Sequence, residues 1–524
     1  MDPREMNLWE EEPKHHSPVA EYYRGKVVLL TGATGFLGKL YMCKLVRCGV
    51  KELIVIVRSK KGVSPKERME KILEKERIFK VHGFGKEQYL RTITVINGDM
   101  DIPGLGLNAE DLEYVRDRTE IVLHAAADVR FDESLNKIIV TNVQGTLGML
   151  NLCVNLKKME LMIYVSTAYA NCVTNVVHEK FYDPPVDPLK MMELMKTVDD
   201  EQSEILTDMI IRPWPNTYTY AKNLAEHLVK MYFDRMNIVI IRPTVVATTM
   251  DDPVQGWTDN LYGLNGVIVG AGCGILRVLT AKDDCKVDII PADYVVNSTL
   301  VAAYRAAEDY RKNAPSTDPD KVHIYHVGSG VDNPLTNSMV SKYTKTIGAD
   351  NPPLRSLWIG SYISTKSSVL SLFLTIFLHF IPGVIIDALL RFKGKRPILM
   401  KIYRKVRKFT NLIEFFAKKE FTFVNDKMRK IMDTMTPGDR ELFQCDIKAL
   451  PWDDYFNIYY PGLKMYVLKE GTETWADAKI RYDRLDLVTI FVLRASVLLG
   501  VYWTICIVLK VWVLISQYIT EDAK

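Results

Sequence analysis

A short apolar run followed by three regularly spaced glycines is the feature that most limits how this chain can fold. Residues 27–31 are Val-Val-Leu-Leu-Thr, and Gly32, Gly35 and Gly38 follow at three-residue spacing. Glycine allows a tight turn and the close approach of another backbone. A helix that begins near Gly35 would direct its N-terminal N–H groups at this turn, where they can bind phosphate. The pattern predicts a strand–turn–helix unit that binds the pyrophosphate of a dinucleotide, and the alternative is an ordinary glycine-rich turn.

The residue at the end of the next strand distinguishes between the two nicotinamide dinucleotides. Residues 52–57 form an apolar run that ends at Arg58, twenty residues after Gly38. An acidic residue here would bind the ribose 2′-hydroxyl of NAD, whereas the planar guanidinium of Arg suits a 2′-phosphate. Lys60 and Lys61 add positive charge. The sequence therefore predicts NADPH, and the alternative is a solvated basic turn.

Strand-like apolar runs alternate with helix-compatible segments from residue 26 to about residue 245. The runs lie at 27–31, 53–57, 92–96, 121–124, 161–166 and 238–242. Such alternation predicts an α/β fold with a doubly wound parallel Rossmann-type sheet, which binds its ligand at the carboxyl ends of the strands. Asp99 follows the third run and is placed to bind the adenine. The small residues Ala125 and Ala126 follow the fourth run and allow a close approach to the ribose.

A tyrosine and a lysine four residues apart form the second informative pattern. In Tyr218-Thr-Tyr-Ala-Lys222 the two side chains share one helix face, one turn apart. A nearby ammonium group favours the phenolate, so we expect Lys222 to lower the pKa of Tyr218 and to prepare it for proton exchange with a substrate oxygen. Tyr220 is a weaker candidate because its i+4 neighbour is Leu224. An exposed helical pair is the alternative interpretation.

Two hydroxyl side chains end the fifth predicted strand, at the edge of the sheet where ligand should bind. Ser166 and Thr167 can each hydrogen-bond a reacting carbonyl oxygen, and the strand-end position favours Thr167; a hydroxyl that satisfies its own turn is the alternative. The predicted catalytic residues are Tyr218, Lys222, Thr167 and Ser166, without a metal. The predicted cofactor-binding residues are Thr31, Gly32, Thr34, Gly35, Phe36, Leu37, Gly38, Arg58, Asp99, Met100, Ala125, Ala126, Tyr218 and Lys222.

The C-terminal end predicts a membrane anchor. Val488–Leu509 and Ala495–Ile515 each hold a single charged residue and are long enough to span a bilayer. A buried helix is the alternative. Basic residues precede this segment and acidic residues follow it, so the positive-inside rule keeps the large N-terminal part in the cytosol. The endoplasmic reticulum, the peroxisome and the lipid droplet are all compatible membranes.

A second apolar stretch, 369–386, is interrupted by His379, Pro382 and Gly383. Nine Lys or Arg residues and no acidic residue follow between positions 391 and 408. A crossing here would put this basic flank on the wrong side of the membrane. We expect an element that rests on an anionic membrane surface, and a helical hairpin in the core of the C-terminal region is the alternative.

With 524 residues, the chain should form more than one domain. The net charge of +4 gives no argument for a nucleic-acid partner, and the eight scattered cysteines predict no disulfide framework. The predicted organisation is a polar N-terminal tail (1–24), an NADPH-binding domain (25–355) in which residues from about 245 to 350 cover the substrate, an apolar membrane-associated segment (365–392), a mostly helical C-terminal domain (393–475) and a transmembrane anchor (487–515).

Taken together, the motifs resemble those of extended short-chain dehydrogenases/reductases and, more narrowly, of eukaryotic fatty acyl-CoA reductases. The stretches that carry the resemblance are Thr31–Gly38, Gly98–Met100, Ala125–Glu133, Val165–Asn171, Tyr218–Lys222 and Ile241–Pro243. Residues 370–470 resemble the helical male-sterility domain of that family. The resemblance therefore covers nearly the whole chain, and the combination is far more specific than any single motif.

The resemblance implies that a long-chain acyl-CoA is reduced by two NADPH to a primary alcohol, through a bound aldehyde and with release of CoA. It implies that Tyr218 donates the proton, that Lys222 binds the ribose, and that Thr167, with Ser166 as second choice, holds the carbonyl oxygen. Two alternatives remain open. One is a membrane-bound sugar-nucleotide epimerase or sterol dehydrogenase with the same Tyr/Lys pair, and the other is a membrane-tethered NADPH-binding scaffold without catalysis.

Overall fold

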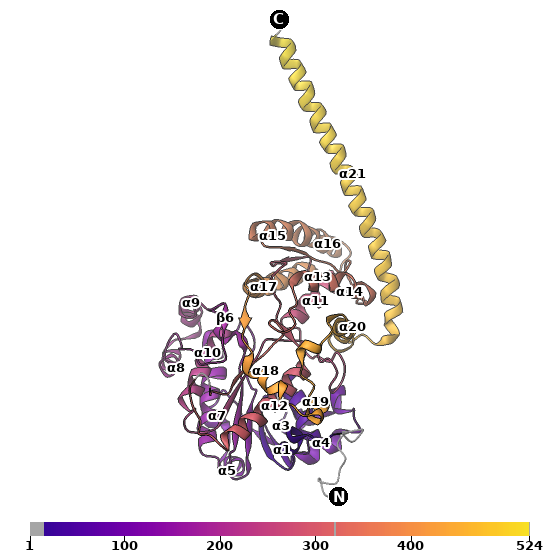
Figure 1. Cartoon of the computed structure of the whole chain (residues 1–524). Helices are drawn as coiled ribbons and strands as arrows, with labels where there is room; N and C mark the ends of the chain where they lie inside the picture. The colour runs from indigo at the N-terminus through magenta and orange to yellow at the C-terminus, as the bar shows by residue number, and fades with distance from the viewer. Residues whose placement is uncertain (1–14, 319–320, 523–524) are drawn as a thin grey trace.

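A seven-stranded parallel sheet forms the centre of the molecule (Figure 1). The computed structural model describes residues 15–318 and 321–522, with the side chains of 492–493, 496–497, 499–500 and 514–522 left undescribed. The strand order is β11-β7-β5-β4-β1-β2-β3, and each neighbouring pair is parallel. The strands are β1 (Val27–Thr31), β2 (Glu52–Val57), β3 (Ile93–Asn97), β4 (Ile121–His124), β5 (Leu161–Val165), β7 (Ile238–Pro243) and β11 (Ile324–Val327). The doubly wound α/β fold expected from the alternating pattern is confirmed.

Helices cover both faces of this sheet, which is why its strands are apolar throughout rather than alternating. Val28 and Leu30 of β1 point to the face covered by α2 (Phe36–Arg47) and α12 (Ala292–Tyr310). Val27 and Leu29 point to the opposite face, under α7 (Gly145–Val154) and α10 (Thr217–Met231). The other helices of this part are α3 (Pro65–Lys75), α4 (Lys86–Thr92), α5 (Ala109–Arg118), α6 (Leu135–Ile138), α8 (Pro188–Thr197) and α9 (Asp200–Ile210).

Three short parallel strand pairs lie outside the central sheet in the described part of the chain. They are β8 (Val245–Val246) with β10 (Ile289–Ile290), β9 (Val278–Thr280) with β12 (Ile363–Thr365), and β6 (Val176–Val177) with β13 (Thr422–Phe423). Because β13 pairs with β6, the C-terminal helical part packs directly on the first domain. The other helices here are α11 (Leu264–Gly272), α13 (Asn337–Lys345), α14 (Ile347–Asp350), α18 (Asp426–Asp433), α19 (Pro437–Leu442) and α20 (Trp452–Gly462).

The N-terminal helix α1 (Pro18–Tyr23) belongs to the folded body. The hydroxyl of Ser17 and the N–H of Val19 both donate to the carboxylate of Asp439, at 2.7 and 3.1 Å. The buried Tyr23 donates its hydroxyl to the carbonyl of Leu300 in α12. The prediction of a polar tail over residues 1–24 is therefore wrong for α1. Residues far away in the sequence, Leu300 and Asp439, contact this short segment. Residues 1–14 lie outside the described part of the chain.

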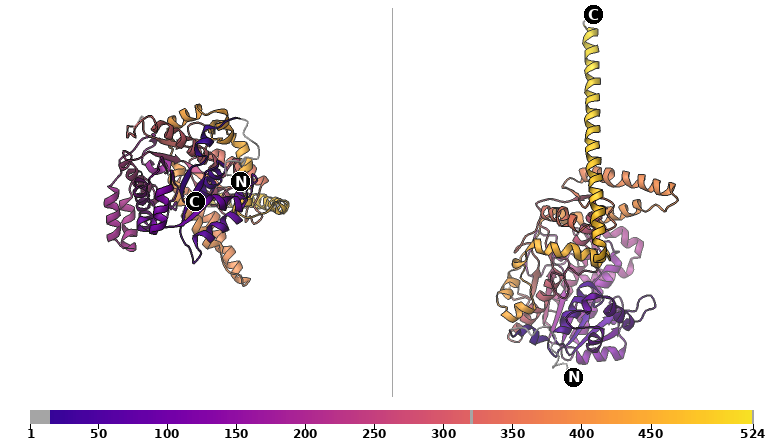
Figure 2. Two further views of the ribbon diagram at one scale, coloured as in Figure 1. Left: turned by 90° about the horizontal axis from the view of Figure 1, so that it is seen from below. Right: turned by 90° about the vertical axis from the view of Figure 1, so that its right-hand side faces the viewer.

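The C-terminal helix α21 (Trp475–Asp522) leaves the body as one long rod (Figures 1 and 2). Beside its exit lies a continuous helix, 368–392, made of α15 (Ser368–Thr375), a π-helical turn (Ile376–Phe380) and α16 (Ile381–Phe392), followed by α17 (Leu399–Lys418). Among the described residues, only helix 368–392 is long and apolar enough to cross a membrane, and α21 contains a shorter apolar stretch, Val501–Val513. Several side chains of the predicted anchor, 487–515, lie outside the described residues, so the anchor stays a prediction.

Candidate active site

The turn between β1 and α2 is built on glycines that no other residue could replace without strain. Gly32 has a φ of +76°, and a Cβ there would lie 2.8 Å from the backbone of Ala125 and Ala126. A Cβ on Gly38 would lie only 2.0 Å from the carbonyl oxygen of Gly32. α2 begins at Phe36, directly after this turn, so its first N–H groups face the carboxyl edge of the sheet. The strand–turn–helix geometry expected of a phosphate-binding turn is present.

Thr31, the last residue of β1, contacts the neighbouring strand end and so holds this turn in place. Its hydroxyl accepts a hydrogen bond from the N–H of Ala126 at 3.3 Å and lies 2.7 Å from Nδ1 of His124. The other ring nitrogen of His124 lies 3.2 Å from the hydroxyl of Thr146. Burial lowers the pKa of His124 to about 3, so its imidazole is neutral. Thr31 and His124 thus join the ends of β1 and β4, and His124 is a core histidine.

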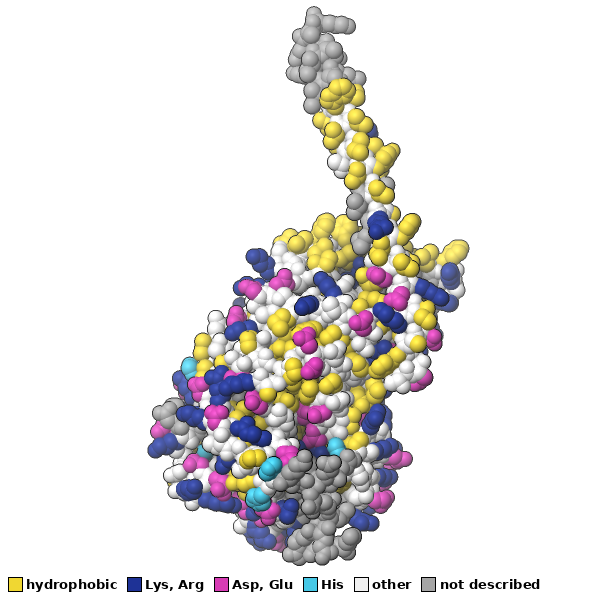
Figure 3. Space-filling model, turned by 45° about the vertical axis from the view of Figure 1, so that its right-hand side comes forward, with side chains coloured by type: hydrophobic (Ala, Val, Ile, Leu, Met, Phe, Trp, Pro, Cys, Tyr) yellow, Lys and Arg dark blue, Asp and Glu magenta, His cyan; other side chains and the backbone are white. Residues whose placement is uncertain are grey.

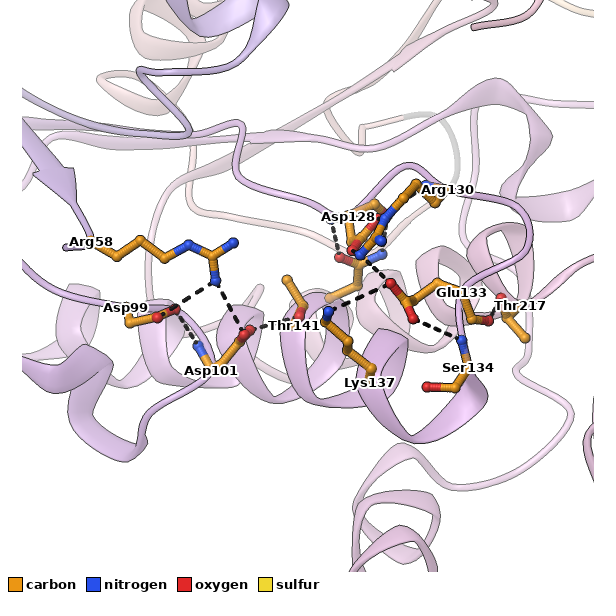
Figure 4. A network of polar contacts seen from close by, with 11 residues as sticks. Arg58, Asp99, Asp101, Asp128, Arg130, Glu133, Ser134, Lys137, Thr141 and Thr217 are labelled. Carbon is orange, nitrogen blue, oxygen red and sulfur yellow. Dashed lines mark hydrogen bonds and ion pairs between the residues drawn. The ribbon is translucent and has the colours of Figure 1, made fainter. Parts of the chain in front are cut away.

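Arg58 lies at the carboxyl end of β2 within a small polar cluster (Figure 4). Its guanidinium is about half exposed and lies 3.6 Å from the carboxylate of Asp99 and 3.4 Å from that of Asp101. Asp101 also accepts a hydrogen bond from Thr141. A second guanidinium, from Arg68 in α3, donates to the backbone carbonyl of Arg58. Sequence reasoning missed Arg68, because the chain folds back through α3 to bring it there.

A polar network holds the start of α10 against the loop that follows β4 (Figure 4). In that loop Arg130 pairs with both Asp128 and Glu133. The hydroxyl of Thr217 donates to the backbone carbonyl of Glu133 at 3.0 Å. Because Tyr218 directly follows Thr217, these contacts hold the first turn of α10 in a defined position at the edge of the sheet.

Aromatic side chains cover Tyr218 from the side of the C-terminal region. Phe131 stacks on the ring of Tyr218 at 5.8 Å, and Phe416 of α17 packs against Phe131 at 5.7 Å. An ion pair between Lys408 of α17 and Asp132 of the same loop, at 2.7 Å, reinforces this contact. Sequence reasoning did not find Phe131 or Phe416 as site residues, since no spacing rule relates two positions that far apart.

Burial raises the pKa of Tyr218 above its ordinary value, and a hydrogen bond with the hydroxyl of Thr167 lowers it only in part. The expected lowering by Lys222 is therefore wrong. The ammonium of Lys222 points to β5, where it donates to the carbonyl of Val165 at 2.9 Å, and burial lowers its own pKa to about 8. Desolvation of the buried phenol is the largest effect on its pKa, because burial disfavours the charged phenolate. Tyr218 consequently keeps its proton at neutral pH, which suits a proton donor.

The two hydroxyls at the end of β5 have different surroundings. Ser166 donates to the carboxylate of Glu226 at 2.5 Å, and Glu226 is in turn paired with the fully buried guanidinium of Arg242 at 2.7 Å. The hydroxyl of Thr167 donates to the backbone carbonyl of Pro243 at 3.4 Å and accepts the N–H of Tyr169 at 3.3 Å, and it lies close enough to Tyr218 to lower the pKa of the phenol. The geometry therefore favours Thr167 over Ser166 as the partner of Tyr218.

A single cavity of about 480 Å³ joins the glycine turn to Tyr218 and continues into an apolar region. Of the predicted site residues, the lining includes Gly32, Gly35, Phe36, Leu37, Gly38, Ala125, Ser166, Thr167, Tyr218 and Lys222. Thr31, Thr34, Arg58, Asp99, Met100 and Ala126 are not among the described residues that line it. The apolar region is walled by Leu264 and Val267 of α11, Leu279 of β9, Val340 of α13, Tyr362, and Ile413 and Phe416 of α17.

Comparisons with known proteins show the family to which the chain belongs. Residues 30–299 match a male sterility protein model that describes an NAD-binding domain, and residues 378–470 match the Sterile model of male sterility proteins. The chain is 35% identical to fatty acyl-CoA reductase wat of Drosophila melanogaster, over 90% of each chain. It is 34% identical to fatty acyl-CoA reductase 1 of Rattus norvegicus and 33% identical to that of Homo sapiens, over 89% of each chain. The chain belongs to the fatty acyl-CoA reductase family.

Solved structures of reductase domains share the fold of this family member. The terminal R domain of the myxalamid biosynthetic pathway has a TM-score of 0.53 at 17% identity and covers 84% of this chain and 90% of its own. The reductase domain of a non-ribosomal peptide synthetase from Mycobacterium tuberculosis has a TM-score of 0.53 at 16% identity, over 88% and 98%. At these sequence identities, the similarity shows a shared fold only. Family and fold together make this protein an oxidoreductase with a nicotinamide cofactor.

Proposed function

We propose that this protein reduces a long-chain fatty acyl-CoA to the primary alcohol with two NADPH, through a bound aldehyde and with release of CoA. The observation that carries the proposal is the single cavity, which connects a phosphate-binding turn, a protonated tyrosine beside a threonine hydroxyl, and an apolar region. The glycine turn suits the pyrophosphate of a dinucleotide. The tyrosine and threonine hydroxyls suit the reduction of a carbonyl group, and the apolar region suits a fatty acyl chain.

The residues at the glycine turn fit the cofactor. A Cβ at Gly32 or Gly38 would collide with neighbouring backbone, so the turn stays narrow and leaves room for the pyrophosphate. The N-terminal N–H groups of α2 would bind the phosphates, and Lys222 would bind the nicotinamide ribose. When bound, NADPH supplies the hydride. Arg58, with Arg68 beside it, would bind the 2′-phosphate at the end of β2.

Tyr218 and Thr167 carry out the chemistry that the chain itself provides. Both hydroxyls would donate hydrogen bonds to the thioester carbonyl oxygen and stabilise the oxyanion that forms when hydride adds to the carbonyl carbon. Collapse of this oxyanion breaks the carbon–sulfur bond and expels the CoA thiolate, which leaves an aldehyde. In the second reduction the phenol of Tyr218 would give its proton to the alkoxide and form the alcohol.

The apolar region of the cavity would hold the acyl chain. Leu264, Leu279 and Phe416 come from three different elements, α11, β9 and α17, and enclose this region together with Tyr362. Since apolar surface is removed from water on both sides, binding should grow stronger with chain length until the region is filled. We also propose a single membrane span near the C-terminus, with the catalytic part in the cytosol at the endoplasmic reticulum, the peroxisome or the lipid droplet.

The proposed function is tested by the stoichiometry of purified full-length protein with palmitoyl- or stearoyl-CoA. We expect two NADPH oxidised for each CoA released, with fatty alcohol as the product. One NADPH per CoA would mean that the reaction ends at the aldehyde. No NADPH oxidation with any acyl-CoA of a chain-length series would reject the reductase in favour of the non-catalytic scaffold, and activity on a sugar nucleotide or sterol would favour those alternatives.

Replacing Arg58 with Ala should raise the KM for NADPH by about tenfold or more, because a charge-assisted contact with the 2′-phosphate is lost. The KM for NADH, which lacks that phosphate, should change little. Lys61→Ala is the matched control, since this exposed residue belongs to the same basic turn. Initial rates with both cofactors measure the effect. Equal changes in the KM values for NADPH and NADH would show that Arg58 does not bind the 2′-phosphate.

Replacing Thr167 with Val should lower kcat for acyl-CoA reduction by about 10²–10³-fold, because one donor to the oxyanion is lost. Ser166→Ala should have a clearly smaller effect on kcat, since this hydroxyl already donates to Glu226. Its main consequence should be a loss of about 1 kcal/mol in the free energy of unfolding. Steady-state kinetics and thermal unfolding of both variants decide the assignment, and the reverse order of kcat values would make Ser166 the carbonyl ligand.

A further inference from the structure

Helix 368–392 has its polar side toward the protein and its apolar side outward. Its buried residues recur every four positions along one face: Ser371, Thr375, His379, Gly383 and Asp387. The exposed large hydrophobic residues are Val369, Leu370, Leu372, Phe373, Ile376, Phe377, Ile381, Val384, Ile385, Ile386, Leu389 and Phe392. A surface helix of a water-soluble domain has the opposite orientation.

Polar residues on the buried face of helix 368–392 contact the body of the protein near the start, the middle and the end of the helix. The hydroxyl of Ser371 shares a hydrogen bond of 2.7 Å with that of Thr280 in β9. The ring of His379 accepts the backbone N–H of Arg277 at 2.9 Å and stacks on Tyr403 of α17. These contacts bind the middle and the start of the helix to two elements of the body.

The end of the helix is held just as firmly. The carboxylate of Asp387 accepts the backbone N–H groups of Ile398, Leu399 and Met400, at 3.0, 2.9 and 2.9 Å, and so caps the start of α17. A Cβ on Gly383 would lie 2.9 Å from the ring of Tyr403, which shows how closely α16 and α17 pack. The helix and α17 therefore form one closely packed pair.

This packing is incompatible with a transmembrane crossing by helix 368–392. A crossing would either strip Ser371, His379 and Asp387 of their partners or draw α17 into the lipid. α17 carries exposed Lys401 and Arg404 on its first turns. Placing such charges at the centre of a bilayer is energetically costly.

The outward face nevertheless has the chemistry of a lipid-facing surface. Hydrophobic side chains gather at the end of the body from which α21 leaves, with basic side chains beside them (Figure 3). The basic residues at the end of the helix and just after it, Arg391, Lys393, Lys395 and Arg396, are all exposed. α21 projects away from the body, whereas helix 368–392 lies crosswise to α21 at the same end of the body (Figures 1 and 2). A bilayer crossed by α21 would meet helix 368–392 side-on.

We propose that helix 368–392 lies flat in the surface of an anionic membrane, with its apolar face among the acyl chains and the basic residues at the headgroups. Lys and Arg side chains near such a surface are attracted to its anionic headgroups. Thr280, which holds Ser371, is the neighbour of Leu279 in the wall of the cavity. The proposed membrane contact therefore lies next to one wall of the cavity. The membrane geometry does not depend on the proposed reaction.

The depth of fluorescent labels along the helix tests this geometry. The full chain, with Cys506→Ser to remove the one cysteine that is not buried, is reconstituted in phosphatidylcholine–phosphatidylserine vesicles. Single cysteines at Val369, Phe377, Ile385 and Phe392 carry an environment-sensitive dye, and lipids spin-labelled near the headgroup or near the bilayer centre quench it. Ile205→Cys is the control, because Ile205 is an exposed apolar residue on α9, a helix of the sheet domain.

We expect all four labels to report one shared depth, about 5–10 Å into the boundary between headgroups and acyl chains, with stronger quenching by the shallow spin label. A spanning helix would instead separate positions 369 and 392 by about 35 Å along the bilayer normal. Such a depth gradient would overturn the proposal. Labels as unquenched as the one at position 205 would also overturn it, and would point to a second copy of the chain or to water on this face. Loss of reductase activity in a variant would leave the depth result unaffected.

Discussion

Tyr218→Phe should lower kcat for acyl-CoA reduction by about 10²–10⁴-fold and leave the affinity for NADPH nearly unchanged. This range is the usual contribution of a positioned acid or base. The substitution removes one hydroxyl and keeps the ring that stacks on Phe131. Because burial holds the pKa of Tyr218 above its ordinary value, the phenol is protonated across the neutral range and can give its proton to the developing alkoxide. Steady-state kinetics and a cofactor titration by fluorescence measure the two effects separately.

Tyr220→Phe provides the matched control for this prediction. Tyr220 lies on the same helix, is buried against Trp214 at 5.7 Å and faces away from the cavity. Removing its hydroxyl should leave kcat within about twofold of the parent and change mainly the free energy of unfolding. If Tyr218→Phe kept more than a tenth of the parent kcat, the proton would have to come from another group, and the mechanism proposed above would fail.

Gly38→Ala should abolish cofactor binding, with a rise of more than about 100-fold in the dissociation constant for NADPH. The new Cβ would lie 2.0 Å from the carbonyl oxygen of Gly32 and 2.8 Å from the Cα of Ala33. Both are backbone atoms of the turn itself, so the clash can be relieved only by opening the turn that we propose holds the phosphates. Isothermal titration with NADPH measures the loss, and circular dichroism shows whether the sheet is still formed.

Two further glycine variants turn this prediction into a graded series. At Gly35 a Cβ would lie 3.2 Å from the same carbonyl oxygen, so Gly35→Ala should weaken NADPH binding less than Gly38→Ala. Gly62 has a φ of +76° and open space around a Cβ, so Gly62→Ala should cost only the strain of a left-handed backbone, about 1–2 kcal/mol of stability. If all three variants bound NADPH equally well, the glycine turn would not be the phosphate site.

Local pattern was enough to predict the parts of the site that depend on near neighbours in the chain. The i, i+4 spacing of Tyr218 and Lys222 places both in the wall of one cavity, and the glycine turn enters the same cavity. The expectation that Lys222 lowers the pKa of Tyr218 was wrong for a physical reason. Spacing reveals how close two groups are, but the loss of water around Tyr218 depends on Phe131 and Phe416, which come from distant segments.

The sequence by itself determined the parallel α/β sheet, the glycine turn between β1 and α2 and the tyrosine–lysine pair, because each follows from periodicity or backbone freedom within a few residues. Only the tertiary structure decided that Ser166 is engaged by the Glu226–Arg242 pair, that burial raises the pKa of Tyr218, and that helix 368–392 turns its apolar face outward. These outcomes depend on atoms brought together from positions far apart in the chain. Desolvation and hydrogen-bond partners are properties of that assembled neighbourhood, and no local pattern contains them.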